Sequence, residues 1–289
     1  MRNEHFAVSP DWRWYILLYF LLAGIAGGAY VIGALLRLTG VDRTAERVAF
    51  LLALPAIVVC PVLLTLDLGS PARFWHMLVN TTPGGGGLNL HPGSPMSVGV
   101  WALSLFSVFS LVSFLAALGR PAGVARLMAG RAGTALTVVG AVLGLFVASY
   151  TGVLLSVGNE AVWSDTWTLG GLFLASGMSA AAAVVAVAAR RRAAAGTERR
   201  LAEADGWFAL VELLFVVLLF ITLAAAGSAS TVLAHGWILL WVVVGLGLLP
   251  PLLGLARRGM AGAMTAVAPV LVILGVLALR AVIIFSPQG

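Results

Sequence analysis

The stretch VAFLLALPAIVVCPVLLTLDLGSPARFWHML (residues 48–78) joins a long uncharged run to a short cluster of polar side chains. Residues 48–66 carry no charge and nearly match the length of about 20 residues that a helix needs to cross the hydrocarbon core of a bilayer. Asp67, Arg73 and His76 follow at once, around a Gly-Ser-Pro break. Such a mixture at the end of a span suits a site that positions a polar headgroup and moves protons beside lipid.

The composition of the whole chain predicts a polytopic membrane protein. Of its 289 residues 61% are hydrophobic and 10% are charged, and its mean hydropathy is +1.05. A soluble globule of this composition would have too little polar surface to cover itself. The net charge of +6 includes no lysine, and most of the arginines lie between the apolar segments. This charge is therefore not a nucleic-acid footprint, and the expected surroundings are the lipid bilayer.

Eight segments are apolar and long enough to span a bilayer, and helices are expected because lipid offers no partner to unpaired backbone groups. They are residues 12–38, 47–68, 97–119, 131–156, 166–189, 206–226, 235–256 and 262–285. Most of the 17 arginines fall in alternate connections, which are the first, third, fifth and seventh. The positive-inside rule then places both termini outside the cytoplasm. Glu4 and Asp11 precede the first span, which reads as a permanent span rather than a cleaved signal peptide.

The predicted outer side carries the longest connection, residues 69–96. Its sequence PGGGGLNLHPGSP (residues 83–95) holds too much glycine and proline for regular helix. A flexible linker and a docking surface for an external partner both fit this composition. Tryptophans near the predicted outer boundaries are expected to anchor spans at the lipid interface; they are Trp12, Trp14, Trp75, Trp163 and Trp167.

Asp67 and His76 are the candidate proton carriers near the outer face. A carboxylate at a lipid boundary is costly unless it is paired or hydrated. Arg73 is a candidate partner for Asp67 across the Gly-Ser-Pro turn. A structural ion pair and a role in proton transfer both fit these residues.

Several motifs occur in a recognisable order along the chain. They read WRWYILLYFLLAGIAGGAYV (12–31), DLGSPARFWHML (67–78), SPMSVGVWAL (94–103), SYTGVLLSVGNEAVW (149–163), LFLASGMSA (172–180) and LRAVIIFSPQ (279–288). With the same number of spans, this order resembles the NrfD/PsrC-type family of membrane subunits, which includes the membrane subunit of polysulfide reductase. The similarity extends over nearly the whole chain.

The resemblance implies an all-α integral membrane subunit of a respiratory oxidoreductase complex. Residues 1–156 would form a four-helix bundle with a quinone site near the outer face, and residues 157–289 a second four-helix bundle. The implied partners are a ferredoxin-like iron–sulfur subunit and a molybdopterin-type catalytic subunit on the extracytoplasmic side of a bacterial cytoplasmic membrane. Menaquinone is favoured over ubiquinone if the lysine-free composition reflects a GC-rich bacterial gene.

The resemblance, together with the chemistry of the polar residues, gives candidates for the quinone site. Tyr150 in the SYTG motif matches a quinone-contacting tyrosine of the family, and with Asp67 and His76 it would carry the quinol chemistry. The alternative for Tyr150 is a buried tyrosine bonded to a neighbouring helix. Tyr19, where some relatives have histidine, would add a hydrogen-bond donor. Arg73 and Asn159 are candidate headgroup contacts, and helix capping fits Asn159 equally well.

Glu212 is expected inside the sixth span, in the sequence WFALVELLFVV (residues 207–217). An ionisable residue within the membrane is a functional hypothesis by default. Asp205 lies seven residues earlier on nearly the same helix face, and Arg280 in the last span is a candidate partner for an acid or a quinone headgroup. The three residues are candidates for a proton path, and a purely structural buried acid is the alternative.

The histidines and the single cysteine argue against a bound prosthetic group. A bis-histidine haem b needs two histidines that face each other from helices, whereas the four histidines lie in outer loops, in the N-terminal tail or at a helix start. They are His5, His76, His91 and His235. Cys60 alone cannot hold an iron–sulfur cluster. The sequence predicts no haem, no metal and no cluster in this chain.

Two other hypotheses fit a polytopic chain. A transporter or permease typically has internal repeats and broken helices around central polar groups, and no convincing repeat joins the two halves here. A structural anchor would hold its partners without touching quinone. Such an anchor would keep full quinol-coupled turnover without the side chains of Tyr150 and Asp67, whereas a quinone-reactive subunit would not.

Overall fold

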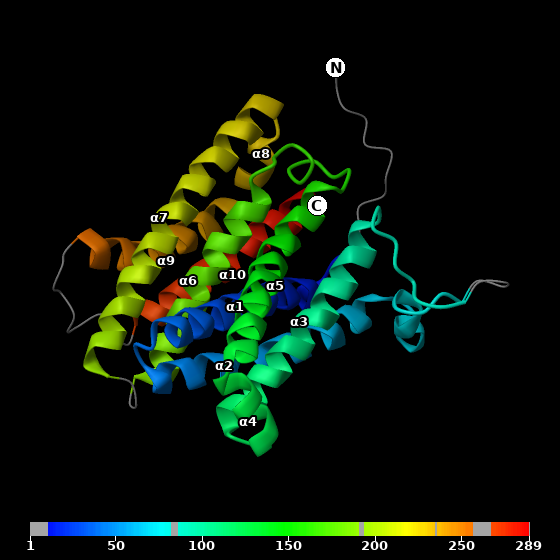
Figure 1. The fold of residues 1–289 in the computed structure, drawn as a ribbon. Coiled ribbons are helices and arrows are strands. Elements are labelled where there is room, and N and C mark those ends of the chain that lie inside the picture. The colour runs from blue at the N-terminus through cyan, green and yellow to red at the C-terminus, as the bar shows by residue number, and fades with distance from the viewer. Residues whose placement is uncertain (1–10, 82–85, 191–193, 235, 257–266, 289) are drawn as a thin grey trace.

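The computed structural model describes residues 11–81, 86–190, 194–234, 236–256 and 267–288 (Figure 1). Within these residues every regular element is a helix, and eight helices are long and apolar enough to cross a membrane. They are α1 (Trp14–Thr39), α2 (Arg43–Asp67), α3 (Pro95–Leu118), α5 (Arg131–Ser156), α6 (Leu169–Ala189), α7 (Ala195–Ala226), α9 (Trp237–Ala256) and α10 (Ala268–Phe285). The prediction of an all-α membrane protein with eight spans is confirmed.

Shorter helical segments occupy several connections of the described chain. They are η1 (Pro71–Met77), α4 (Ala122–Ala129), α8 (Ala229–Leu233) and η2 (Ser286–Gln288). Pro71 begins η1 and Pro121 directly precedes α4. Proline is tolerated at a helix start because the N–H that it lacks has no intrahelical partner there. Hydropathy alone leaves both segments as loops.

The helix α7 begins at Ala195, well before the predicted start at residue 206. Its first turns are polar, and Arg199 forms an ion pair with Glu203 at 2.9 Å, one turn further on. Arginine, glutamate and alanine are good helix formers, so the helix continues past the apolar segment, where hydropathy gives no signal. The predicted start of the last span, at residue 262, lies outside the described residues.

The helices α1 and α6 form the centre of the packing (Figure 1). In their apolar windows 78% and 72% of the residues are buried, against 28% for α3, α7 and α9. Glycines bring α1 close to its neighbours: a Cβ on Gly24 would lie 3.1 Å from the backbone of Gly177 in α6, and a Cβ on Gly27 would overlap the Gly144 carbonyl in α5. Small residues let membrane helices approach closely.

Contacts between the spans follow two closed circuits. In one, α1 contacts α2, α2 contacts α3, α3 contacts α5, and α5 returns to α1. In the other, α6 contacts α7, α7 contacts α9, α9 contacts α10, and α10 returns to α6. The circuits meet where α6 packs on α1 and α5, and where α10 touches α1.

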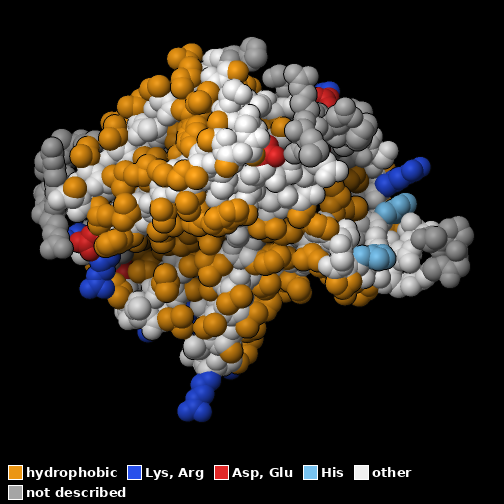
Figure 2. All heavy atoms as spheres, turned by 90° about the horizontal axis from the view of Figure 1, so that it is seen from above, with side chains coloured by type: hydrophobic (Ala, Val, Ile, Leu, Met, Phe, Trp, Pro, Cys, Tyr) orange, Lys and Arg blue, Asp and Glu red, His pale blue; other side chains and the backbone are white. Residues whose placement is uncertain are grey.

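Hydrophobic side chains cover most of the face shown in Figure 2, and charged side chains lie mainly near its edges. The exposed hydrophobic side chains include many from the spans themselves, for example Val62, Val142 and Ile221, which are 57%, 61% and 58% exposed. Water would not stabilise such a surface, whereas a bilayer does. The eight apolar helices and this surface together describe a multi-pass membrane protein.

The connection between α5 and α6 folds inward against α10 and against Trp12, which precedes α1. Trp163 is 2% exposed and donates a hydrogen bond through Nε1 to the Ile283 carbonyl at 2.6 Å. Its ring stacks on Trp12 with centroids 4.9 Å apart, and the backbone N–H of Trp12 donates to Gln288 at 2.9 Å. The prediction of an interfacial anchor is therefore wrong for Trp163, because this connection packs against α10.

Asp42 joins the start of α2 to the start of α7. One carboxylate oxygen accepts hydrogen bonds from the backbone N–H groups of Thr44 and Ala45, at 2.8 and 3.0 Å. The other accepts from the N–H of Ala194 at 2.9 Å and from the hydroxyl of Thr197 at 2.7 Å. Burial alone would raise the pKa of this carboxyl, but these hydrogen bonds favour its charged form and hold the pKa below its usual range.

Replacing Asp42 with asparagine is expected to destabilise the fold by about 1–2 kcal/mol at neutral pH. The amide can still cap α2, but its NH₂ faces the donors at Ala194 and Thr197. Because the folded-state pKa of Asp42 lies below the unfolded value of about 3.9, this contribution is present above pH 4 and is lost as the pH falls through the folded-state pKa. Thermal unfolding in detergent from pH 7 downward tests this: a difference between variant and wild type that persists unchanged at low pH would contradict it.

Candidate functional site

A pocket with a cavity volume of about 260 Å³ lies between α3 and α5. The segment before α3 closes one side of it. The lining residues are Pro92, Gly93, Pro95, Val98, Phe146, Ser149, Tyr150, Val153 and Val157. The volume falls slightly below the range of about 300–1,000 Å³ common for small-molecule sites. An apolar lining with few polar groups is typical of such sites, and this pocket has that character.

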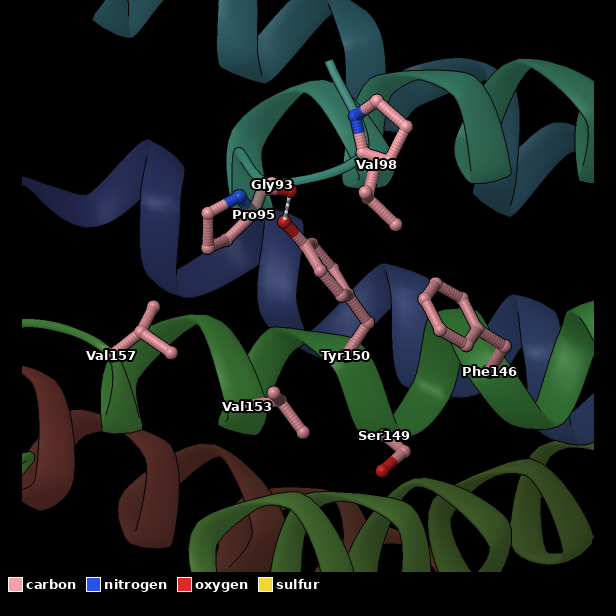
Figure 3. Close-up of a pocket in the computed structure, with 9 residues that line it drawn as sticks. Gly93, Pro95, Val98, Phe146, Ser149, Tyr150, Val153 and Val157 are labelled. Carbon is pink, nitrogen blue, oxygen red and sulfur yellow. Dashed lines mark hydrogen bonds between the residues drawn. The ribbon is translucent and has the colours of Figure 1, made fainter. Parts of the chain in front are cut away.

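Tyr150 reaches across the pocket from α5 to the start of α3 (Figure 3). Its hydroxyl donates a hydrogen bond to the Pro95 carbonyl. Its ring lies so close to Gly99 that a Cβ at this position would overlap the ring. Phe146, one turn earlier on α5, stacks on the ring with centroids 5.4 Å apart. Tyr150 is thus a pocket residue and also a tyrosine bonded to a neighbouring helix.

The pocket opens on a surface made by a membrane span. Phe146, Val153 and Val157 are 40%, 44% and 55% exposed, and the first two belong to α5 while Val157 directly follows it. Ser149 turns away from the Tyr150 hydroxyl in Figure 3, and its own hydroxyl donates to the Gly170 carbonyl of α6 at 3.1 Å. A molecule that enters from lipid therefore meets an apolar wall and the phenol of Tyr150.

Tyr19 lies on α1 and does not line this pocket. It is 5% exposed, and its ring packs beside Phe20 with centroids 5.3 Å apart. Cys60 of α2 points its thiol at the Tyr19 backbone carbonyl, at 3.8 Å. The Tyr19 hydroxyl has no hydrogen-bond partner within the described residues, and it is close enough to Tyr150 to interact with it electrostatically.

Asp67, Arg73 and His76 are not brought together into the pocket. Asp67 is the last residue of α2 and is half-buried, whereas Arg73 is exposed on η1. Between these two described residues no ion pair forms. The candidate pairing of Asp67 with Arg73 is therefore not found; Gly69, with φ 62°, lies in the turn between them. His76 lies on the same η1, edge-on to the ring of Trp75 at 4.1 Å.

Asn89 holds the segment after η1 against both η1 and α3. Its side chain donates to the His76 carbonyl at 2.8 Å, and its backbone N–H donates to the Leu78 carbonyl at 2.8 Å. Its own carbonyl accepts from Ser97 and from Trp101 Nε1, each at 3.1 Å. Residues 86–91 therefore have a defined shape, although their sequence also fits a flexible linker. In Figure 1 this segment projects with η1 beyond the ends of the spans.

Asn159 lies in the connection after α5 and is exposed. The end of α5 is closed by a backbone hydrogen bond at Val157. The side chain of Asn159 makes no hydrogen bond within the described part of the chain, so the capping role is not found. It does not line the pocket, which reaches Val157 two residues earlier.

Arg280 is fully buried where α10 meets α6 and α1. Its guanidinium donates to the Ser176 hydroxyl at 3.1 Å and to the Phe173 carbonyl at 3.2 Å, and it lies 5.0 Å from the centroid of the Phe173 ring. Its Nε has no hydrogen-bond partner among the described residues. A Cβ on Gly24 would lie 2.8 Å from the guanidinium, so a glycine in α1 makes room for this charge.

Glu212 and Asp205 lie along α7 beside the same face of α6. Glu212 is 2% exposed and faces a small cavity that it shares with Ser179. Asp205 accepts a hydrogen bond from the Ser179 hydroxyl at 2.5 Å. Arg280 is near enough to act on Glu212 electrostatically, without a direct ion pair between these described residues. The structure therefore brings together the three candidates of the predicted proton path.

The pocket wall from residues 92–98 was missed by sequence reasoning, although the SPMSVG motif (residues 94–99) contains two of its lining residues, Pro95 and Val98. The sequence feature that could have indicated this wall is Gly99, a glycine one turn into a span that follows a Pro-rich loop. Only the fold shows that Gly99 faces Tyr150. Within the described residues no group of three or more His, Cys, Asp or Glu side chains is placed to hold a metal ion. His5 and His235 lie outside the described residues.

Comparison with known proteins gives two matches. A family model described as "Polysulphide reductase, NrfD" matches residues 4–288. The C subunit of polysulfide reductase from Wolinella succinogenes is 27% identical to this protein over 316 aligned residues, which cover 96% of this protein and 94% of the relative. Both matched regions include Tyr150 of the pocket and the buried acids of α7.

Proposed function

Because this chain belongs to the NrfD family of polysulphide reductase membrane proteins, we propose that it is the membrane subunit of a respiratory oxidoreductase and binds quinone or quinol at the Tyr150 pocket. The pocket opens on a lipid-facing surface, its lining is apolar, and one phenol in its lining donates its hydroxyl to the Pro95 carbonyl. A quinone ring and tail need apolar surroundings, and its oxygens need hydrogen-bond partners. The position of the Tyr150 hydroxyl is the observation that carries the proposal.

The chemistry proposed for the pocket follows from the phenol and from the nearby polar groups. Oxidation of a quinol releases two electrons and two protons, and reduction of a quinone takes up the same number. In the proposal the Tyr150 hydroxyl turns from the Pro95 carbonyl to a quinone oxygen. Tyr19 lies outside the pocket lining and acts on the site only through its electrostatic interaction with Tyr150. Asp67 and His76 accept protons at the end of α2 and on η1. The ring donates its electrons to a partner protein.

The partners proposed are a ferredoxin-like iron–sulfur subunit and a molybdopterin-type catalytic subunit on the extracytoplasmic side. Support comes from η1 and residues 86–91, which project past the spans and are held in shape by Asn89. This surface exposes Arg73 and Trp75 for contact with another protein. The arginines of alternate connections support extracytoplasmic termini in a bacterial cytoplasmic membrane. Menaquinone is the quinone favoured.

Co-purification in mild detergent tests the proposed assembly. Mass spectrometry of the proteins retained with this chain is expected to find an iron–sulfur protein together with a molybdopterin-type protein. Their identity would also define the terminal substrate. Recovery of the chain alone, or only with copies of itself, would count against the respiratory complex and favour the transporter hypothesis.

The two circuits of helix contacts support a division into two four-helix bundles, with the quinone site in the first. In the second, we propose that Asp205, Glu212 and Arg280 form a path for protons between α6, α7 and α10. The Asp205–Ser179 hydrogen bond and the shared surroundings of Ser179 and Glu212 support this path. A buried acid near an arginine also fits a purely structural role, and proton uptake by sealed vesicles during quinol oxidation distinguishes the two.

Replacing Gly99 with alanine is expected to displace the Tyr150 ring, because the added methyl group would overlap it. Overpacking of this kind costs about 1–3 kcal/mol of stability. Steady-state quinol oxidation should show a raised KM, since the phenol is moved and not removed. Gly123→Ala in α4 is the matched control, because its Cβ would meet no atom within 4 Å. An unchanged KM in Gly99→Ala would contradict the placement of the quinone at this pocket.

A further inference from the structure

The helix α9 contains two adjacent prolines, Pro250 and Pro251, in its interior. Proline has no backbone N–H, so the carbonyl four residues earlier loses its helical hydrogen bond. In α9 these carbonyls belong to Leu246 and Gly247. Two consecutive losses, with Gly245 directly before them, make this a point where the helix bends easily.

The weakened turn of α9 lies against the cavity that Glu212 faces. That cavity is lined by Ser179, Glu212, Val244, Gly247, Leu248, Val272, Gly275 and Val276. Gly247 also lies close to α10, since a Cβ there would lie 2.7 Å from the Gly275 Cα. A bend at the prolines therefore moves Gly247 and Leu248, which form one wall of the cavity.

The Glu212 carboxyl is closed in by this wall. It is 2% exposed and makes no hydrogen bond within the described residues, and the cavity as it stands is too small for a water molecule. The charged groups near it are Asp205 on its own helix and Arg280 on α10, while the described part of α9 contains no titratable residue. Glu212 can exchange a proton with water only after one of these walls moves.

We propose that the Pro250–Pro251 pair in α9 is a hinge that opens the cavity at Glu212 and so controls when its carboxyl exchanges a proton. In the open form the proton passes from Glu212 to water admitted to the cavity, and Arg280 remains as the cation near the carboxylate. In the closed form the carboxyl is protonated and isolated. The inference rests on the proposed proton path and adds the moving element to it.

Labelling with dicyclohexylcarbodiimide tests the hinge in membranes that hold the full complex. This lipid-soluble reagent modifies protonated carboxyl groups, and mass spectrometry of the peptide that contains Glu212 gives the rate. The double variant Pro250→Ala/Pro251→Ala restores two backbone donors to α9. Labelling of Glu212 is expected to slow roughly tenfold, because opening must then break two added hydrogen bonds.

Two further variants keep the test decisive. Gly245→Ala stiffens the same turn, and its added methyl group meets no atom within 4 Å. It should also slow labelling, and it can be measured even if the double variant does not fold. Pro55→Ala/Pro61→Ala makes the same change in α2, which contributes nothing to the cavity, and should leave the rate unchanged. Labelling at the wild-type rate in both α9 variants, or slowing in the α2 variant to the same extent, overturns the hinge.

Two measurements on the same membranes, quinol oxidation and Glu212 labelling, distinguish failure of the hinge from failure of the proposed function on which it rests. Quinol oxidation depends on the Tyr150 pocket, whereas labelling reports only access to Glu212. If quinol oxidation is normal and the α9 substitutions do not change the labelling rate, the hinge is rejected and the quinone site is not. Labelling that responds to those substitutions in a complex without quinol activity supports the hinge and rejects the quinone site.

Discussion

Replacing Tyr150 with phenylalanine is expected to lower quinol-dependent turnover by about 10²-fold while the protein still folds and assembles. The substitution removes one hydroxyl and leaves the ring that packs between Phe146 and Gly99. In the structure this hydroxyl is held by the Pro95 carbonyl, so it is oriented before a quinone arrives. Loss of a preoriented donor lowers kcat more than it raises KM, and steady-state assays with a soluble quinol analogue separate the two effects.

Tyr30→Phe is the matched control for this result. Tyr30 is fully buried in α1, and its hydroxyl is hydrogen-bonded to Ser113 of α3 at 2.8 Å, away from the pocket lining. Both substitutions remove a buried phenolic hydrogen bond, which costs about 1 kcal/mol of stability. Equal turnover in Tyr150→Phe and wild type would support a structural anchor that does not touch quinone, and equal losses in the two variants would point to a general effect on folding.

Replacing Arg280 with alanine is expected to give the largest loss of stability, about 3–5 kcal/mol. The change leaves a cavity beside Gly24, removes the donors to Ser176 and Phe173, and takes away the cation nearest to Glu212. For a protein of this size each kcal/mol corresponds to roughly 2–4 °C in Tm. Thermal unfolding in detergent should therefore show a fall of roughly ten degrees.

A second comparison shows whether charge or packing causes that loss. Arg199→Ala removes an ion pair whose side chains are 75% and 52% exposed and should leave Tm unchanged within error, because exposed pairs contribute little. Glu212→Gln in the Arg280→Ala background removes the acid left without a cation. A double variant that is more stable than Arg280→Ala alone indicates coupling through charge; strict additivity of the two changes would show that only packing matters.

The spans could be predicted because lipid imposes one rule on every helix that crosses it. Hydropathy alone located α5 to the residue, since Gly130 and Arg131 mark its start and Gly158 lies two residues past its end. It missed the polar start of α7 because helix that extends beyond the bilayer has no hydropathy signal. The buried position of Trp163 was also missed, since a tryptophan near a boundary has the same sequence signal whether it faces lipid or folds over α10.

The candidate site could be predicted only in part. Motif resemblance identified Tyr150, and intramembrane charge identified Glu212 and Arg280, because an ionisable group in lipid is unusual wherever it lies. Arg73 was a candidate partner for Asp67 because the two are close in sequence, but no ion pair forms between these described residues. Pro95 and Gly99 contact Tyr150 from α3, a helix far away in the sequence. No spacing of residues along the chain predicts these contacts.

Photolabelling of the purified complex with an azido-naphthoquinone tests most directly whether quinone binds at the Tyr150 pocket. Labelled peptides located by mass spectrometry are predicted to come from residues 146–157 and 92–98, the two walls of the pocket. Excess unmodified naphthoquinone should compete the label away, and Gly99→Ala should weaken it. Label confined to other helices, with these two segments unmodified, would contradict the quinone site.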